Sequence, residues 1–100
     1  MARPDRLSTQ AAEAKLSDVP GWRIEDGKLR RKFSFADFPT AFAFMTRVAL
    51  HAEAMNHHPE WTNVWAHVDV TLVTHDAGGL TDLDFALARV MSGAAQPVDE

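Results

Sequence analysis

Hydrophobic and polar residues alternate with two different periods along this chain of 100 residues. Apolar side chains that recur every three to four positions predict helices, and strict alternation predicts strands. By this criterion we expect helices at about residues 9–16, from near Pro39 to Asn56, and after Thr81. Residues 22–35 and 61–75 have the alternation of strands.

The segment 22–35 predicts a β-hairpin that is apolar on one face. Asp26-Gly27 is a strong two-residue turn signal, because a type I′ turn needs positive φ at both central positions. Counting outward from this turn, Ile24 faces Leu29 and Glu25 faces Lys28. Alternation then divides the side chains between a buried face, with Trp22, Ile24, Leu29, Phe33 and Phe35, and a wet face, with Arg23, Glu25, Lys28, Arg30 and Lys32.

The two outer helices have recognisable start signals. Ser8 or Thr9 can cap the first helix, because a side-chain oxygen can accept an unpaired backbone N–H of the first turn. Thr81 with Asp84 three positions later predicts a capping box at the start of the last helix. Residues 1–7 and 94–100 are expected to fray at the two ends of a single domain that spans 1–100.

The central helix has more apolar residues than one buried face needs. Ser34, with Asp37 three residues later, is a candidate N-cap, and Pro59 predicts an end near Asn56 because it disfavours helical backbone at the preceding residue. One apolar stripe at helical spacing contains Phe38, Ala41, Phe42, Met45, Val48, Ala49 and Ala52. Phe44 and Leu50 lie off this stripe, so we expect a second packing partner for the helix, such as another subunit.

The segment 61–75 is too long for one ordinary strand. Val64, Ala66, Val68, Val70 and Leu72 alternate with polar or aromatic residues, but fifteen residues at about 3.3 Å each would span about 50 Å. A turn or a strong bend is therefore expected near residues 65–67. The order of elements is helix, two strands, helix, two strands (or one bent strand) and helix, which predicts an α+β fold with the helices on one face of an antiparallel sheet.

Composition narrows the possible functions. The net charge of −4 argues against general nucleic-acid binding, and the absence of cysteine removes every cysteine-based metal or redox mechanism. No apolar run approaches the roughly 20 residues that a membrane-spanning helix needs, and the N-terminus lacks the apolar segment of a signal peptide. A cytoplasmic protein is the expectation.

Three of the five histidines lie where predicted elements end. His57 and His58 follow the central helix in the stretch NHHPEW, and His75 follows the last strand. Functional side chains collect at such places, and histidine exchanges protons near neutral pH. Surface or capping roles are the alternative for each of them. His51 and His67 are assigned no role.

A metal site is a weaker interpretation of the same histidines. HxxxH spacing on one helical face is missing, and adjacent imidazoles point in different directions, so we expect no metal. Trp61 can be a stacking wall for a flat ligand or a core residue, and the core is the simpler reading.

These residues together resemble the signature of the pterin-4a-carbinolamine dehydratases. The matching positions are Glu53, His57, His58, Pro59, Trp65, His75 and Asp84, and the words FMTRVAL, HHPEW, NVW and THDAGGL are similar to that family too. The resemblance spans about residues 20 to 92. It implies a four-stranded antiparallel sheet with three helices on one side, in the order α-β-β-α-β-β-α, and a homodimer or homotetramer.

The resemblance also implies a hydro-lyase reaction. Such enzymes eliminate water from 4a-hydroxytetrahydrobiopterin to give quinonoid dihydropterin, in the recycling of the pterin used by aromatic amino acid hydroxylases. They need no metal and no organic cofactor, since the pterin is the substrate. The alternative is a non-catalytic oligomeric binding module with a vestigial pocket.

Site roles follow from the resemblance residue by residue. His57, His58 and His75 are expected to be the catalytic residues, with His57 and His75 as the acid–base pair and His58 orienting the substrate or sharing the proton transfer. Around them the substrate-binding residues would be Asn56, Pro59, Trp61, Thr74 and Asp76, while Glu53, Trp65 and Asp84 are motif positions of structural character.

Two departures from the family pattern are visible. Asn56 stands where relatives are often acidic, so carboxylate help to the adjacent histidines is in doubt. Trp65 stands where tyrosine is frequent, which is a change of packing alone. A role as dimerisation cofactor of a homeodomain transcription factor, known for some animal members, has no support in this sequence.

Overall fold

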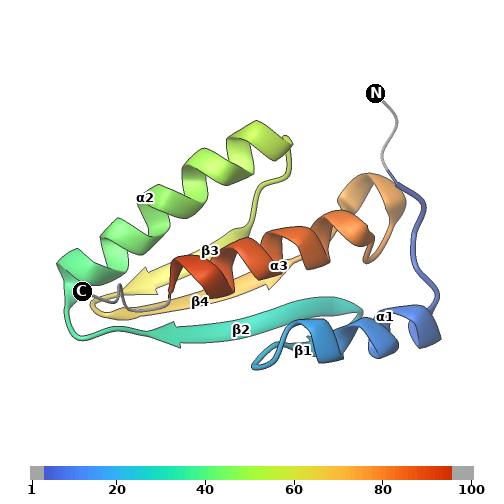
Figure 1. Cartoon of the computed structure of the whole chain (residues 1–100), viewed down its shortest axis with the longest axis horizontal. Coiled ribbons are helices and arrows are strands. Elements are labelled where there is room, and N and C mark those ends of the chain that lie inside the picture. The colour runs from blue at the N-terminus through green and yellow to red at the C-terminus, as the bar shows by residue number, and fades with distance from the viewer. Residues whose placement is uncertain (1–3, 96–100) are drawn as a thin grey trace.

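A computed structural model of the chain describes residues 4–95 (Figure 1). Its helices are α1 (Thr9–Lys15), α2 (Phe38–Met55) and α3 (Asp82–Ala94). Its strands are β1 (Arg23–Glu25), β2 (Lys28–Ser34), β3 (Glu60–Val64) and β4 (His67–Leu72). These helices and strands follow one another in the order α-β-β-α-β-β-α. Two short 3₁₀ turns, η1 (Leu16–Asp18) and η2 (His75–Ala77), lie between them.

The four strands form one antiparallel sheet in the order β1-β2-β4-β3. Asp26 and Gly27 both have positive φ, at 54° and 73°, and the pairs Ile24↔Leu29 and Glu25↔Lys28 have the predicted register. The second hairpin turns at Trp65, with φ of 50°, between the paired residues Val64 and His67. The α+β prediction is therefore confirmed, with two strands in place of one bent strand.

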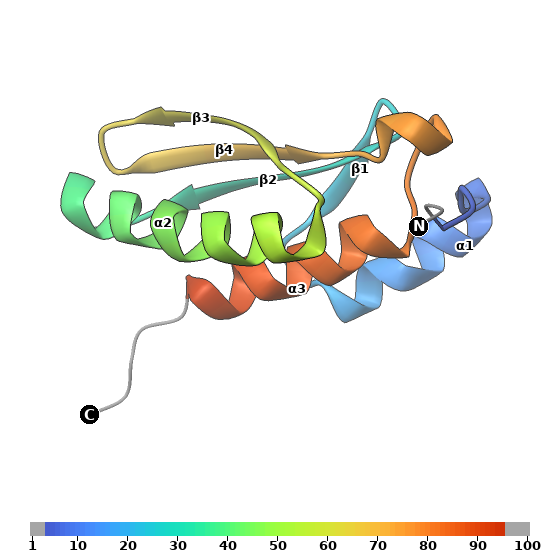
Figure 2. The ribbon, with the colours of Figure 1, turned by 90° about the horizontal axis from the view of Figure 1, so that it is seen from above.

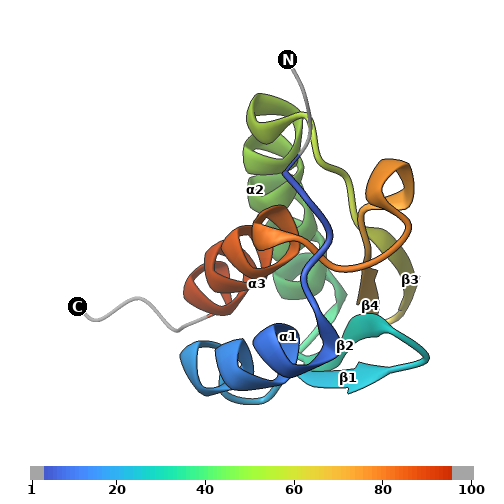
Figure 3. The ribbon, with the colours of Figure 1, turned by 90° about the vertical axis from the view of Figure 1, so that its right-hand side faces the viewer.

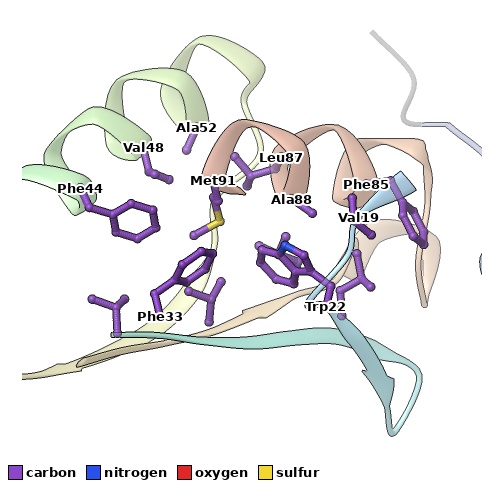
Figure 4. Close-up of a cluster of buried hydrophobic side chains, with 14 of the residues drawn as sticks. Val19, Trp22, Phe33, Phe44, Val48, Ala52, Phe85, Leu87, Ala88 and Met91 are labelled. Carbon is purple, nitrogen blue, oxygen red and sulfur yellow. The ribbon is translucent and has the colours of Figure 1, made fainter. Parts of the chain in front are cut away.

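All three helices lie on one side of the sheet (Figures 2 and 3). Figure 4 shows the apolar core between the two layers, where Phe33 of β2 packs against Trp22, with ring centroids 5.7 Å apart, and against Phe44, at 4.8 Å. Val48 and Met91 close the same cluster from α2 and α3. Burial of these side chains is the main force that holds the helices on the sheet.

Helix α2 packs on a different stripe from the one predicted. Its buried residues are Ala41, Phe44, Val48 and Ala52, whereas Phe38 and Phe42 are 45% and 55% exposed. The prediction for Phe38, Phe42 and Phe44 was therefore wrong. Apolar residues at helical spacing fit two adjacent stripes, and the position of the sheet selects the one that contains Phe44.

The start of α2 and one strand position also differ from the predictions. Asp37, and not Ser34, is the N-cap of α2, since its Oδ1 accepts the Thr40 backbone N–H at 2.9 Å. Ser34 ends β2 and its hydroxyl is 3.0 Å from Nδ1 of His67. Val64 is exposed because it pairs with His67 on the outward face of the sheet, whereas its neighbour Asn63 pairs with buried Val68.

Both ends of the described chain are attached to the fold. Within the segment expected to fray, the Leu7 N–H donates to the Leu80 carbonyl at 2.8 Å, and Leu7 packs against the core. At the other end Ala94 is still helical. Fraying of residues 1–7 and 94–100 stays a prediction, and most of these residues, 1–3 and 96–100, lie outside the described part.

Candidate functional site

The end of α2 sends two adjacent histidines in opposite directions. Asn56 adopts a left-handed conformation, with φ of 50°, and its N–H bonds back to carbonyls of the last helical turn. The His57 N–H then donates to the Ala52 carbonyl at 3.0 Å, which holds the chain close to the helix end. As a result His57 points inward and is 4% exposed, whereas His58 lies on the surface.

His57 meets a buried carboxylate. Its Nε2 is 2.6 Å from Oδ1 of Asp84, which is fully buried at the start of α3. The other oxygen, Oδ2, accepts the Thr81 backbone N–H at 2.9 Å and the Thr74 hydroxyl at 2.8 Å. Thr81 also caps α3, so the predicted capping box is confirmed, and Asp84 serves the helix and the histidine together.

The two surface histidines each lie beside a glutamate. His58 Nε2 is 2.8 Å from Oε1 of Glu53, in the last turn of α2. His75 Nε2 is 3.3 Å from Oε1 of Glu60, the first residue of β3. All four side chains are more than half exposed, so these contacts are weak in free energy and act mainly on orientation.

A loop of defined geometry presents His75. Thr74 and Gly79 exchange two backbone hydrogen bonds, of 3.1 and 3.3 Å, and close the segment between β4 and α3. Gly78 ends η2 with φ of 75°, a conformation that glycine adopts without strain. The closed loop therefore holds His75 at its start, next to buried Thr74.

The structure brings the three predicted histidines to one small pocket. Its volume is about 180 Å³, and it is lined by His57, His58, Val73, Thr74, His75 and Asp76. The lining residues come from the end of α2 and the end of β4, which are distant in sequence. Thr74 and Asp76, both predicted to contact substrate, are at this pocket.

Other predicted positions lie outside the pocket lining. Trp61 packs against the hydrophobic core, as the simpler interpretation had it, and Asn56 and Pro59 adjoin the histidines without lining the pocket. Trp65 lies in the turn at the far end of the β3–β4 hairpin, with its ring centroid 5.8 Å from that of His67. Trp65 is therefore not a wall of this pocket.

The structure corrects the expectation about carboxylates near the histidines. Asn56 is not acidic, yet Glu53, Glu60 and Asp84 each lie beside one of the three imidazoles. Glu60 and Thr81 also lie at the site, although no role was predicted for them there. A signal for Thr81 was present in its capping box, but Glu60 is recognisable only once β3 and β4 are paired.

A larger pocket lies elsewhere and has fewer side chains that can transfer protons. It has a volume of about 530 Å³ and lies between the start of α1 and the loop around Gly78 and Gly79. Among the described residues, Arg6 is the one charged residue in its lining, which includes no histidine or carboxylate. The smaller pocket is the candidate site because three imidazoles converge there.

Two other features are absent from the described part of the chain. Within residues 4–95 no group of three or more histidine, aspartate or glutamate side chains is placed to hold a metal ion. No helix in the same range has the length and apolar character to cross a membrane.

Known proteins with similar sequences share one family. A protein from Rhizobium johnstonii named "Putative pterin-4-alpha-carbinolamine dehydratase" is 55% identical over 93 residues, which cover 91% of this chain and 92% of that protein. The crystal structure of a transcriptional coactivator/pterin dehydratase from Brucella melitensis superposes with a TM-score of 0.90 at 44% identity. The match covers 92% of this chain and all of the Brucella chain.

A more distant neighbour shares the fold alone. A pterin dehydratase-like protein identified as a RuBisCO assembly factor in the alpha-carboxysome matches with a TM-score of 0.65 and 23% identity, over 75% of this chain and 89% of its own.

The sequence model of the family described as pterin 4 alpha carbinolamine dehydratase matches residues 5–94. The chain therefore belongs to the pterin 4 alpha carbinolamine dehydratase family.

Proposed function

We propose that the protein eliminates water from a 4a-hydroxytetrahydropterin and releases quinonoid dihydropterin, as part of tetrahydrobiopterin recycling. The observation that carries the proposal is the convergence of His57, His58 and His75 on one pocket. Family membership supports a pterin as the substrate. The reaction changes no oxidation state, so it needs no redox cofactor.

The reaction needs one proton removed and one supplied. The bond from C4a to the hydroxyl oxygen breaks, the N5–H bond gives its electron pair to a new C4a=N5 bond, and the oxygen leaves as water after protonation. Positioned acid–base groups each contribute about 10²- to 10⁴-fold to such steps. We assign this proton transfer to His57 and His75, and the orientation of the substrate to His58.

Pocket size agrees with partial enclosure of a flat ring. The volume of about 180 Å³ is below the roughly 300 Å³ at which ligand sites begin, so a pterin must remain partly open to solvent or displace side chains. His58 and His75 are exposed and held by single surface contacts, so they are free to reorient around the ring. His57 is held in place by its buried partner.

The decisive experiment measures the loss of chemically generated 4a-carbinolamine with purified protein. We expect acceleration by the wild type, and a rate reduced at least tenfold in His57→Ala and in His75→Ala. His51→Ala is the matched control, because His51 lies on α2 outside the pocket lining. Full activity in both pocket variants, with circular dichroism unchanged, would contradict the proposed mechanism.

We further propose that the protein acts as a homodimer or homotetramer beside an aromatic amino acid hydroxylase in the cytoplasm. Within residues 4–95 five large apolar side chains are exposed: Phe38, Phe42, Leu50, Val64 and Trp65. A soluble monomer rarely exposes contiguous apolar patches of large area. Phe38 and Phe42, which the sequence had placed on the main stripe of α2, are exposed neighbours with ring centroids 5.8 Å apart and form an apolar surface beside the buried stripe.

The same exposed side chains support a second candidate function, a non-catalytic oligomeric binding module. In that case the pocket would be vestigial, and the protein would bind a partner through α2 without accelerating dehydration. The carbinolamine assay separates the two functions. A wild-type rate equal to the uncatalysed rate would favour the binding module.

A further inference from the structure

We propose that Asp84 is a positioning residue that fixes the tautomer of His57, so that its Nδ1 is the proton acceptor at the pocket. The tautomer is a property of the protein alone, whereas its consequence for catalysis depends on the proposed dehydratase function. The hydrogen bonds around Asp84 have directions that determine which nitrogen of His57 carries the proton.

Two donors of certain direction meet one oxygen of the carboxylate. The Thr81 backbone N–H can only donate, and it points to Oδ2 at 2.9 Å. The Thr74 hydroxyl donates to the same oxygen at 2.8 Å. Oδ2 therefore accepts twice, and Oδ1 is the oxygen that faces His57.

A further hydrogen bond joins the hydroxyls of Thr74 and Thr81, and its direction can be assigned in the same way. Thr74 has one hydroxyl hydrogen, which it gives to Asp84, so in the 2.8 Å contact between the two hydroxyls Thr81 must be the donor. The Thr81 oxygen in turn accepts the Leu83 backbone N–H at 3.2 Å. Every hydrogen bond in this buried chain then has a fixed direction and leads towards the carboxylate.

Such a carboxylate is an acceptor, and its remaining partner must donate. His57 therefore carries its proton on Nε2 when the ring is neutral, because a neutral imidazole has one N–H and one lone pair. The lone pair then lies on Nδ1, on a ring that lines the pocket. This geometry makes the neutral ring a general base towards a pocket ligand, and makes Asp84 a fixed negative partner for the imidazolium that forms.

In the proposed reaction Nδ1 of His57 accepts the N5 proton. The N–H electron pair forms the C4a=N5 bond, and the C4a oxygen departs as water with a proton from a second group, which we assign to His75. Proton and electron counts balance without an added reagent. Asp84 does not touch the substrate and acts through the ring of His57.

The amide variant Asp84→Asn gives an unusually clear test. The Thr81 N–H requires an acceptor at its end of the side chain, so the amide oxygen must face Thr81 and the NH₂ group must face His57. His57 would then accept at Nε2, and its proton would move to Nδ1. The change reverses the tautomer while it keeps the size of the side chain and the helix cap.

The measurement is a two-bond ¹H–¹⁵N correlation spectrum of uniformly labelled protein at a pH well above the usual histidine pKa of about 6.5. His57 is assigned by the loss of its signals in His57→Gln. We expect the Nε2–H tautomer in the wild type and the Nδ1–H tautomer in Asp84→Asn. We expect kcat to fall about 10²- to 10⁴-fold in the variant.

Asp82→Asn is the matched control. It makes the same chemical change in the first turn of the same helix, on an exposed side chain that pairs with Lys15 at 3.2 Å. Tautomer and rate should both equal those of the wild type. If Asp84→Asn fails to fold, the wild-type spectrum still decides the question.

The outcomes separate the inference from the proposed function. A wild-type Nδ1–H tautomer, or an unchanged tautomer in folded Asp84→Asn, overturns the positioning role even if the protein is an active dehydratase. An Nε2–H tautomer that reverses in the variant supports the positioning role even if no dehydration is observed, and in that case the proposed function alone fails.

Discussion

Nε2 of His57 and Oδ1 of Asp84 lie 2.6 Å apart in the protein interior, although 27 positions separate the two residues in the chain. The contact joins the end of α2 to the start of α3. It also connects the helix cap of α3 to the pocket that contains three imidazoles. One buried carboxylate thus serves stability and the candidate chemistry together.

Replacement of Asp84 by alanine should therefore cost stability as well as activity. It leaves the Thr81 N–H, the Thr74 hydroxyl and His57 without their buried acceptor, and a buried unsatisfied group costs about 1–3 kcal/mol. We expect Asp84→Ala to lower the free energy of unfolding by about 3 kcal/mol or more in urea titrations. Asp82→Ala, on the exposed side of the same turn, should cost less than about 1 kcal/mol.

The N-cap of α2 should give a pH-dependent contribution to stability. The side-chain and backbone hydrogen bonds of Thr40 hold the pKa of Asp37 below its usual value. A lowered folded-state pKa means that the stabilisation is present above the unfolded-state pKa and is lost as the pH falls through the folded-state pKa.

The difference in Tm between wild type and Asp37→Ala should therefore be largest near neutral pH. It should shrink as the pH falls below the ordinary aspartate pKa of about 3.9. Asp37→Asn is the control, since an asparagine cap accepts the same hydrogen bond without titrating. A Tm difference that does not change with pH would mean that the ionised cap is not the cause.

Phe44 and Phe42 lie on opposite kinds of surface of α2, the first on its buried face and the second on its exposed face. Phe44 is fully buried against Phe33, whereas Phe42 is 55% exposed. Phe44→Ala should lower the free energy of unfolding by about 3–5 kcal/mol, because it leaves a cavity in the core. Phe42→Ala should change the stability of the isolated chain by much less. Equal losses in urea titrations would contradict the orientation of α2.

The proposed self-association depends on the exposed side chains of α2. We expect light scattering to give a mass above that of one chain for the wild type, and expect Phe42→Glu to reduce it, since a charge cannot be buried unpaired in an apolar interface. Arg47→Glu is a control for charge at an exposed position of the same helix. A wild type that remains monomeric at high concentration would remove the basis for a homodimer or homotetramer.

Local signals in the sequence determined the elements and their order. The Asp26-Gly27 turn, the capping box of Thr81 with Asp84 and the alternation in β2 and β4 depend on backbone preferences over a few residues, and the structure has each of them. The histidines at element ends were visible in the same way. Their shared pocket followed from the family resemblance and not from spacing.

Tertiary packing determined the features that local sequence patterns did not predict. Apolar spacing on α2 fits two adjacent stripes, and contact with the sheet alone selects Phe44 over Phe42. The glutamate beside His75 and the order of donors around Asp84 depend on the pairing of β3 with β4 and on the placement of α3 against α2. Such contacts join residues far apart in the chain, and local periodicity carries no information about distances across a fold.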